Sequence, residues 1–238
     1  MRDDVRSPAE SPVETARPVA LVTGASSGIG SAIARSLAPT HDLLLGGRDE
    51  TSLSLLASEL SGAQAWPFDL TNAASADLGL LQRLDVLVHS AGIALLGPLS
   101  EASQADWRTT FDLNVFAVAE LTNLVLPQLR AASGHVVLIN SGAGLNAGPG
   151  WGVYAASKFA LRAYADALRG DEPSLRVTSV YPGRTATPMQ EDVRRQEGGD
   201  YDPAQYIDPA SVGRAVASAV LATPDAHITE INVRSRPR

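Results

Sequence analysis

Short apolar stretches alternate along this chain with segments of helical character, and this alternation constrains the fold more than any other feature. Seven stretches that are short, apolar and in part β-branched predict strands, at residues 19–22, 43–45, 65–68, 85–89, 135–140, 176–181 and 228–233. Helices are expected between most of them, at residues 28–38, 51–60, 102–130, 153–169 and 209–222. The alternation predicts an α/β fold in which helices cover both faces of a mostly parallel, seven-stranded sheet.

Residues 18–238 are expected to form a single domain, because nothing within them resembles an interdomain linker. Residues 1–17 mix charges with prolines and small polar side chains, which predicts a flexible N-terminal tail. The alternative for this segment is an arm that docks on a partner subunit. The charged, glycine-broken stretch 189–207 is expected to be a mobile surface insertion.

The composition excludes several classes of function. Cysteine is absent, so the chain has no disulfide framework, zinc–thiolate site or thiol nucleophile, and we predict no metal site. This fits a reducing compartment, and a cytoplasmic location is expected. The net charge of −7 argues against nucleic acid or an anionic membrane as a partner. No apolar run approaches the roughly 20 residues that a membrane helix needs.

A glycine-rich segment, TGASSGIG at residues 23–30, follows the first predicted strand and opens a helix. Glycine lets the backbone turn tightly and approach a ligand, and a helix N-terminus presents free N–H groups to phosphate. On the first strand of an alternating chain, this pattern favours a dinucleotide site over simple turn chemistry, which is the alternative. The residues expected at this site are Gly24, Ser26, Ser27, Gly28, Ile29 and Gly30.

The end of the second predicted strand bears on the choice of nucleotide. An acidic residue there would bind the ribose 2′-hydroxyl of NAD, but this chain has Gly47 followed by Arg48. A guanidinium offers planar donors that match a phosphate, so we expect NADP(H) as the cofactor. The alternative is that Arg48 is a solvated surface charge paired with Asp49 or Glu50.

Tyr154 and Lys158 lie four residues apart in a predicted helix and should share one face. A free phenol has a pKa of about 10, and a nearby ammonium is expected to lower it. Such a phenol could protonate a carbonyl oxygen while a nicotinamide supplies hydride. Ser141, at the end of strand 135–140, could return beside the phenol and bind the substrate oxygen, or could be only a turn residue.

Taken together, these motifs resemble those of the short-chain dehydrogenase/reductase family, from about Pro18 to about Arg234. The matching motifs, in the family's order and spacing, are TGASSGIG (23–30), Asp69 in FDL, HSAG (89–92), Asn114 in LNV, Ser141, Tyr154-Ala-Ala-Ser-Lys158 and PGRTAT (182–187). The resemblance implies a Rossmann-type doubly wound fold and an NADP(H)-preferring enzyme that reduces a ketone, aldehyde or ketoacyl group. It also implies a homodimer or homotetramer in which helices from 102–130 and 153–169 meet a partner subunit.

The resemblance also implies individual roles. Tyr154 would be the general acid in reduction, while Lys158 would lower its pKa and bind the nicotinamide ribose. Ser141 would orient the carbonyl, and Asn114 would hold a water that links Lys158 to solvent. Thr187 would lie near the nicotinamide carboxamide. Tyr154 would also contact the cofactor. Further cofactor-binding residues would be Asp69, Leu70, Ser90, Ala91, Gly92, Pro182, Gly183 and Thr185; for Pro182 and Gly183 a simple turn is the alternative.

Four residues depart from the family pattern. His89 and Ser90 stand where two asparagines are frequent; Ser90 is expected to hydrogen-bond the neighbouring strand, and His89 to be structural rather than catalytic. Arg184 and Thr185 stand where apolar residues are commoner. They could add polarity near the cofactor or approach an acidic substrate.

The sequence limits the substrate only loosely. The candidate apolar walls are Leu145, Trp151 and Met189, which suit a hydrophobic ketone or aldehyde. A β-ketoacyl thioester, a steroid-like ketone and a small aldehyde all remain open. The rival functions are an NAD-dependent alcohol dehydrogenase on the same fold and a non-catalytic protein that senses NADP(H). The four residues of the proposed proton relay, Asn114, Ser141, Tyr154 and Lys158, argue against the sensor.

Overall fold

A computed structural model describes residues 16–76 and 78–236 of the chain. Its centre is a seven-stranded sheet in the order β3-β2-β1-β4-β5-β6-β7, and every neighbouring pair is parallel. The strands are β1 (Val19–Thr23), β2 (Asp42–Gly47), β3 (Ala63–Pro67), β4 (Val86–His89), β5 (His135–Ile139), β6 (Arg176–Pro182) and β7 (Glu230–Val233). All seven predicted strands are confirmed. Most of the predicted tail, residues 1–15, lies outside the described residues.

Helices connect the strands, as the alternation predicted. They are α1 (Gly28–Leu37), α2 (Glu50–Glu59), α3 (Gln104–Phe111), α4 (Ala117–Ala132), α5 (Gly152–Asp171), α6 (Pro188–Gln196) and α7 (Pro209–Val220). Short helical turns are η1 (Leu70–Ser75), η2 (Leu78–Leu80), η4 (Gly142–Gly144) and η5 (Pro203–Gln205), and α3 continues into α4 through a π-helical turn, η3 (Asp112–Phe116).

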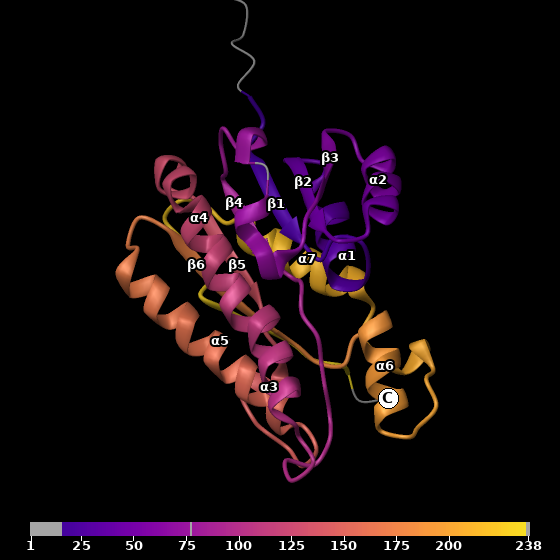
Figure 1. Ribbon diagram of the computed structural model, residues 1–238. Helices are drawn as coiled ribbons and strands as arrows, with labels where there is room; N and C mark the ends of the chain where they lie inside the picture. Colours follow the sequence, from indigo (N-terminus) through magenta and orange to yellow (C-terminus); the bar gives the residue numbers. More distant parts are fainter. Residues whose placement is uncertain (1–15, 77, 237–238) are drawn as a thin grey trace, which may run out of the picture.

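Two hydrophobic cores lie on opposite faces of the sheet, because successive strand residues point to opposite sides. In β1, Leu21 packs into the core that contains α4 and α5, whereas Ala20 and Val22 pack into the core that contains α1, α2 and α7. Figure 1 shows α4 and α5 side by side in front of the sheet and α1 beside α7. Burial on both faces explains why the strands are almost continuously apolar.

The strand order reverses direction between β1 and β4, and this reversal positions the site. The chain runs outward from β1 to β2 and β3, then returns to β4 on the other side of β1. Connections leaving β1 and β4 therefore diverge and open a crevice at the carboxyl ends of these strands. The glycine-rich segment and the HSAG segment both begin there.

The stretch 189–207 was expected to be a mobile surface insertion, but it contains most of the helix α6. Thr187 is the N-cap and accepts a hydrogen bond from the Gln190 N–H at 3.2 Å, and Pro188 occupies the first turn. After α6 and η5 the chain returns to a β-bridge between Thr185 and Ile207. The sequence carries a signal for this helix, Thr187-Pro188 followed by polar residues, but the charges and glycines of the stretch favour an irregular insertion instead.

Candidate active site

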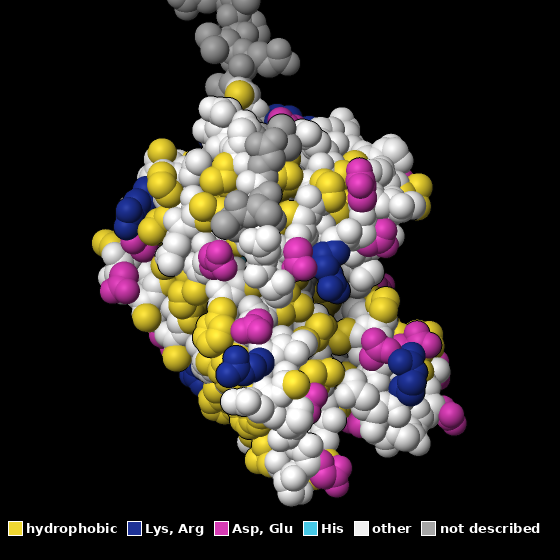
Figure 2. Space-filling model, viewed as in Figure 1, with side chains coloured by type: hydrophobic (Ala, Val, Ile, Leu, Met, Phe, Trp, Pro, Cys, Tyr) yellow, Lys and Arg dark blue, Asp and Glu magenta, His cyan; other side chains and the backbone are white. Residues whose placement is uncertain are grey.

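One cavity of about 1710 Å³ lies at the carboxyl ends of the strands and extends beneath α6. It is lined by every candidate cofactor-binding and catalytic residue except Asn114. On the face seen in Figure 2, the surface is indented between the part that carries α6 and the rest of the molecule. Residues that are far apart in the sequence, from the glycine-rich segment to α6, therefore border a single space.

The glycine-rich segment is built so that side chains would not fit. A Cβ on Gly30 would lie 2.2 Å from the Gly24 carbonyl oxygen. Gly24 itself has φ +65°, and its Cβ would lie 2.8 Å from the Ala91 backbone. Ser27 is the N-cap of α1 but makes no side-chain capping bond, so the first N–H groups of the helix are left for a ligand. This backbone cradle fits a pyrophosphate.

Arg48 is exposed at the rim of the cavity and has no carboxylate oxygen within 4.0 Å in the part of the chain that the structure describes. Asp49, its expected alternative partner, instead caps α2 by accepting from the Ser52 N–H at 3.1 Å. Pairing of Arg48 with Asp49 or Glu50 is therefore wrong, and the guanidinium is available to a ligand.

Asp69 and Leu70 form the neighbouring wall of the cavity. The Asp69 carboxylate accepts hydrogen bonds from the Thr71 hydroxyl at 2.8 Å and the Thr71 N–H at 2.9 Å. These bonds, with a smaller contribution from the charge of Arg48, lower the pKa of Asp69. Leu70 is buried beside it.

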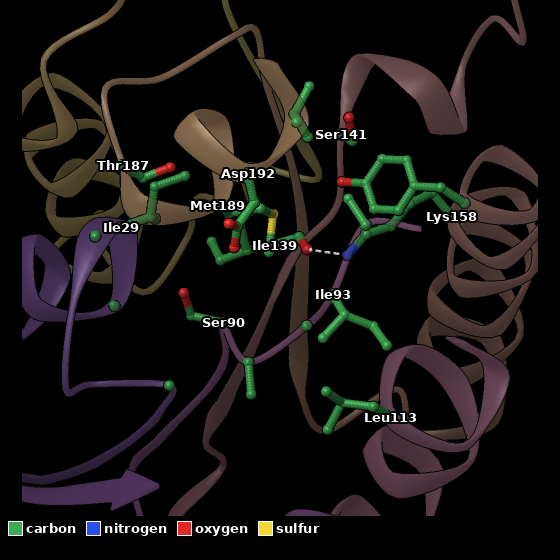
Figure 3. Close-up of a pocket in the computed structure, with 18 of the residues that line it drawn as sticks. Ile29, Ser90, Ile93, Leu113, Ile139, Ser141, Lys158, Thr187, Met189 and Asp192 are labelled. Carbon is green, nitrogen blue, oxygen red and sulfur yellow. Dashed lines mark hydrogen bonds between the residues drawn. The ribbon is translucent and has the colours of Figure 1, made fainter. Parts of the chain in front are cut away.

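Tyr154 and Lys158 lie on one face of α5, as predicted, and both are buried. The Lys158 ammonium lies 5.8 Å from the centroid of the Tyr154 ring and donates to the Ile139 carbonyl oxygen at 3.0 Å. Figure 3 shows this bond, with Ser141, Thr187 and Met189 around the same cavity. The amine is thereby held at the end of β5.

Burial decides the protonation of this pair. It raises the pKa of Tyr154, and the Ser141 hydroxyl opposes that rise as a hydrogen-bond partner. Burial also lowers the pKa of Lys158 to about 8. The expectation that the ammonium lowers the phenol's pKa is wrong for the protein without ligands, because desolvation of the phenolate is the largest effect.

Asn114 lies in the π-helical turn η3 and is fully enclosed. Its Oδ1 accepts from the Ile93 N–H at 2.9 Å, while Nδ2 donates to the Ile93 carbonyl oxygen at 2.9 Å and to Ser157 Oγ at 3.0 Å. A Cβ on Gly92 would lie 3.0 Å from Asn114 Oδ1 and 3.8 Å from Lys158 Nζ, so the amide and the amine are near each other. Asn114 thus ties the segment after β4 to α5; the water that it was expected to hold stays a prediction.

Asn140 holds the backbone of Ser141 and Lys158 in place, and the sequence analysis did not identify it. Its Nδ2 donates to the Lys158 carbonyl oxygen at 3.0 Å, and its Oδ1 accepts from the Ser141 N–H at 2.8 Å. A Cβ on Gly144 would lie 2.3 Å from Asn140 Oδ1, so glycine is needed there. The signal was an asparagine directly before Ser141 at the end of a buried strand.

The HSAG segment supports the cofactor wall through its backbone. The N–H groups of Ser90 and Ala91 donate to Thr23 Oγ1 at 3.1 and 3.3 Å, so the link to β1 uses the main chain of Ser90 rather than its hydroxyl. His89 is buried, and its Nε2 lies 2.9 Å from Thr122 Oγ1. Burial lowers the pKa of His89 to about 3, so it is neutral and structural, as expected.

The segment after β6 closes the other side of the cavity, beginning at Pro182. A Cβ on Gly28 would lie 3.1 Å from Thr187 Cγ2, so the N-terminus of α6 packs directly on the glycine-rich turn. Thr185 is buried, and its hydroxyl donates to the Gly183 carbonyl oxygen at 2.9 Å. That hydroxyl therefore stabilises the loop.

Apolar side chains surround Tyr154 on the substrate side. Ala94, Val193 and Trp151 belong to a small cluster with the tyrosine, and the Trp151 ring lies 5.9 Å from the Tyr154 ring. Trp151 and Met189 line the cavity, whereas Leu145 does not. Two of the three expected walls are therefore in place.

Polar contacts hold α6 over this apolar cluster. Arg184 donates to the Glu197 carboxylate at 2.8 Å and lies 5.5 Å from the centroid of the Trp151 ring. The Gln196 amide bonds the Ala94 carbonyl oxygen at 3.0 Å and the Leu96 N–H at 2.8 Å. Because Arg184 is already paired with Glu197, this arginine is a structural tie rather than a free anion site.

Among the described residues, no group of three or more histidines, aspartates or glutamates could hold a metal ion. The same part of the chain contains no helix with the length and apolar character required to span a membrane.

Comparison with known proteins agrees with this geometry. Residues 18–198 match the family model described as short chain dehydrogenase. An uncharacterised short-chain type dehydrogenase/reductase of Sinorhizobium fredii is 35% identical over 224 residues, covering 90% of each chain. Glycine betaine reductase of Emericella nidulans is 34% identical over 239 residues, which cover 92% of this chain but only 19% of that protein.

Among solved structures, an alcohol dehydrogenase from Thermococcus sibiricus in complex with 5-hydroxy-NADP superposes with a TM-score of 0.83 at 26% identity. It covers 93% of this chain and 99% of its own. The matched family model spans the glycine-rich segment, the Tyr154–Lys158 pair and the start of α6, which are the parts that border the cavity. The chain is therefore an oxidoreductase of the short-chain dehydrogenase/reductase family.

Proposed function

We propose that the protein is an NADP(H)-dependent carbonyl reductase that converts a ketone or aldehyde to an alcohol. The observation that carries this proposal is the single cavity that joins the phosphate cradle, an unpaired Arg48 and the buried Tyr154–Lys158 pair. Such a space can hold a dinucleotide along the strand ends with its nicotinamide beside the phenol. Reduction is the proposed direction, because NADP(H) pools usually favour it.

The residues present fit NADP(H). The backbone of the glycine-rich segment and the free N-terminus of α1 would bind the pyrophosphate. Arg48 would bind the 2′-phosphate, with Asp69 and Leu70 at the adenine and Thr187 near the carboxamide. The similar alcohol dehydrogenase from Thermococcus sibiricus was solved in complex with 5-hydroxy-NADP, which supports the same choice.

The protein's own residues would then handle the proton. The bound coenzyme supplies hydride to the carbonyl carbon. Ser141 and Tyr154 hold the carbonyl oxygen, and the phenol donates its proton as negative charge develops there. A raised pKa suits this role, because it keeps Tyr154 protonated at neutral pH. An alkoxide is a far stronger base than a phenolate, so it still takes the proton, and Lys158 stabilises the phenolate that remains.

The test is NADPH consumption with a panel of ketones and aldehydes, measured by the absorbance of the reduced coenzyme. Tyr154→Phe should reduce turnover at least about a hundredfold and leave the Kd for NADPH nearly unchanged, since it removes only the acid. Arg48→Ala should lower kcat/KM for NADPH more than for NADH, while Arg108→Ala, an exposed arginine outside the cavity, should change neither. Equal turnover by the phenylalanine variant would refute the proton transfer, and a wild-type preference for NADH would refute the choice of coenzyme.

We further propose that the enzyme works as a cytoplasmic homodimer or homotetramer. Phe116 and Phe159, which belong to the helical segments expected at the subunit interface, expose 59% and 41% of their surface. Figure 2 shows hydrophobic side chains gathered over the region of α3, α4 and α5. Sedimentation of the wild type and of Phe159→Glu, with exposed Leu221→Glu as control, measures this; a monomeric wild type would contradict it.

A further inference from the structure

Arg234, the first residue after β7, borders the same cavity as Ser141 and Tyr154. Its position is fixed by the sheet, because β7 pairs with β6 and the Gly183 N–H donates to the Val233 carbonyl oxygen at 2.8 Å. The parallel sheet therefore positions Arg234 at the carboxyl ends of the strands, where the substrate is expected to bind.

The guanidinium of Arg234 is directed back across the end of β6. Nη1 donates to the Tyr181 carbonyl oxygen at 2.7 Å, and Nη2 donates to Asn232 Oδ1 at 3.1 Å. Three atoms of the guanidinium lie 3.7–3.8 Å from the point that a Cβ on Gly142 would occupy. The charged group is thus anchored against the residue that follows Ser141.

The charge of Arg234 is not compensated, in contrast to Arg184 and Arg195, which border the cavity near α6. Arg184 pairs with Glu197, and Arg195 pairs with Asp192. Within residues 16–76 and 78–236, no carboxylate oxygen lies within 4.0 Å of the Arg234 guanidinium, and its hydrogen bonds all go to uncharged oxygens. Those bonds engage Nη1 and Nη2, so the Nε–H and a second N–H on Nη2 remain free for a ligand.

We propose that Arg234 binds a carboxylate of the carbonyl substrate, so that the enzyme reduces oxo acids to hydroxy acids. This inference rests on the proposed reductase activity and names its substrate class. A guanidinium with two free N–H groups matches a carboxylate, and such a bond is among the stronger ones a protein makes. The carboxylate takes no part in the reaction: hydride adds to the carbonyl carbon, Tyr154 protonates the carbonyl oxygen, and the hydroxy acid that forms retains the carboxylate.

Two fixed points would orient this substrate. Its carbonyl oxygen is held at Ser141 and Tyr154, and its carboxylate is held at Arg234. Holding a substrate at both ends places the carbonyl carbon repeatedly in one geometry, which favours attack on one face. Arg184, the residue first considered for an acidic substrate, is already paired with Glu197.

The test compares matched acids and esters with the intact enzyme and NADPH. The pairs are acetoacetate with methyl acetoacetate, and succinic semialdehyde with its methyl ester. Wild type should have the higher kcat/KM for the acid of at least one pair. Arg234→Met should lower that value about 10- to 100-fold, as expected for a lost charged hydrogen bond, and leave the ester within about twofold. Arg234→Lys should restore part of the acid activity.

Arg236→Met is the matched control, because Arg236 is an exposed arginine two residues further along that does not line the cavity. It should leave both substrates unchanged. Titration calorimetry adds a readout without turnover, because a hydroxy acid cannot react with the reduced coenzyme: 3-hydroxybutyrate should bind the wild type in the presence of NADPH and bind Arg234→Met at least about tenfold more weakly.

The outcomes separate the two proposals. Esters favoured over acids by the wild type in both pairs, or an equal loss for acid and ester in Arg234→Met, would overturn the inference while leaving the reductase standing. No NADPH consumption with any carbonyl would overturn the proposed function itself. If Arg234→Met lost NADPH binding through misfolding, the wild-type preference and Arg234→Lys would decide the matter.

Discussion

Lys158 is the only lysine among the 238 residues, so its ionisation can be followed without interference from another side-chain amine. Burial lowers its pKa from the ordinary 10.5 to about 8. Protein labelled with ¹³C at the lysine ε-carbon should give one side-chain resonance, and that resonance should titrate near pH 8 in the ligand-free protein. A midpoint above pH 10 would refute the inference that burial controls this amine.

The same shift has a consequence for stability. Below pH 8 the amine is charged in both the folded and the unfolded chain, so folding bears the full cost of burying the charge. A shift of 2.5 units corresponds to about 3.4 kcal/mol. As pH rises from 8 to 10.5 the folded protein releases its proton first, the unfolded state binds more protons, and stability from this group rises. The cost should therefore fall by about 2.5 kcal/mol between neutral pH and pH of about 10.

Urea unfolding of wild type and Lys158→Met at these two pH values measures that change. Groups away from Lys158 titrate alike in both proteins and cancel in the difference. Burial raises the pKa of its neighbour Tyr154, which keeps that phenol neutral in the folded state over most of this pH range. The Ile139 carbonyl oxygen loses its donor in the variant, but this loss is present at both pH values and cancels as well. The variant should gain stability relative to wild type at neutral pH, and most of this gain should disappear at the higher pH. A difference that does not depend on pH would contradict the argument.

Two further substitutions test the frame of the site. Gly30→Ala places a Cβ 2.2 Å from the Gly24 carbonyl oxygen, so the backbone of the turn would have to move. The Kd for NADPH in a fluorescence titration should therefore rise at least about tenfold. An unchanged Kd would show that the turn can shift without losing the cofactor site. Asn140→Ala removes the donor to the buried Lys158 carbonyl oxygen and the acceptor of the Ser141 N–H, so the free energy of unfolding in urea should fall by about 1–3 kcal/mol. A loss below about 0.5 kcal/mol would mean that these groups find other partners.

The sequence predicted the sheet because its strands are buried on both faces and therefore read as apolar runs between helices. It predicted the cavity because glycine spacing and the four-residue step from Tyr154 to Lys158 are local patterns. Asn140 was not predicted from the sequence, because its role depends on a hydrogen bond to Lys158, which lies 18 residues away on α5. The protonation of Tyr154 was misjudged for a related reason: spacing reveals a neighbouring charge, but desolvation depends on packing that only the folded protein defines.

The opposite shifts of Tyr154 and Lys158 are consistent with one another and with proton donation. Before transfer the phenol is neutral, because burial raises its pKa, and the pKa of the amine is only about 8. A neutral phenol attracts the ammonium only weakly, so the resting enzyme gains little energy from this pair. Once the phenol gives up its proton, a phenolate lies near the ammonium in the same buried space. With the 5.8 Å from Lys158 Nζ to the centroid of the Tyr154 ring taken as the separation of the two charges, and an effective dielectric constant of about 20, the attraction amounts to roughly 3 kcal/mol. That attraction exists only after the proton has begun to leave, and interactions confined to this stage are the ones that accelerate a reaction. A pair already ionised in the resting enzyme would have gained the same energy too early, and Tyr154 would have had no proton to donate.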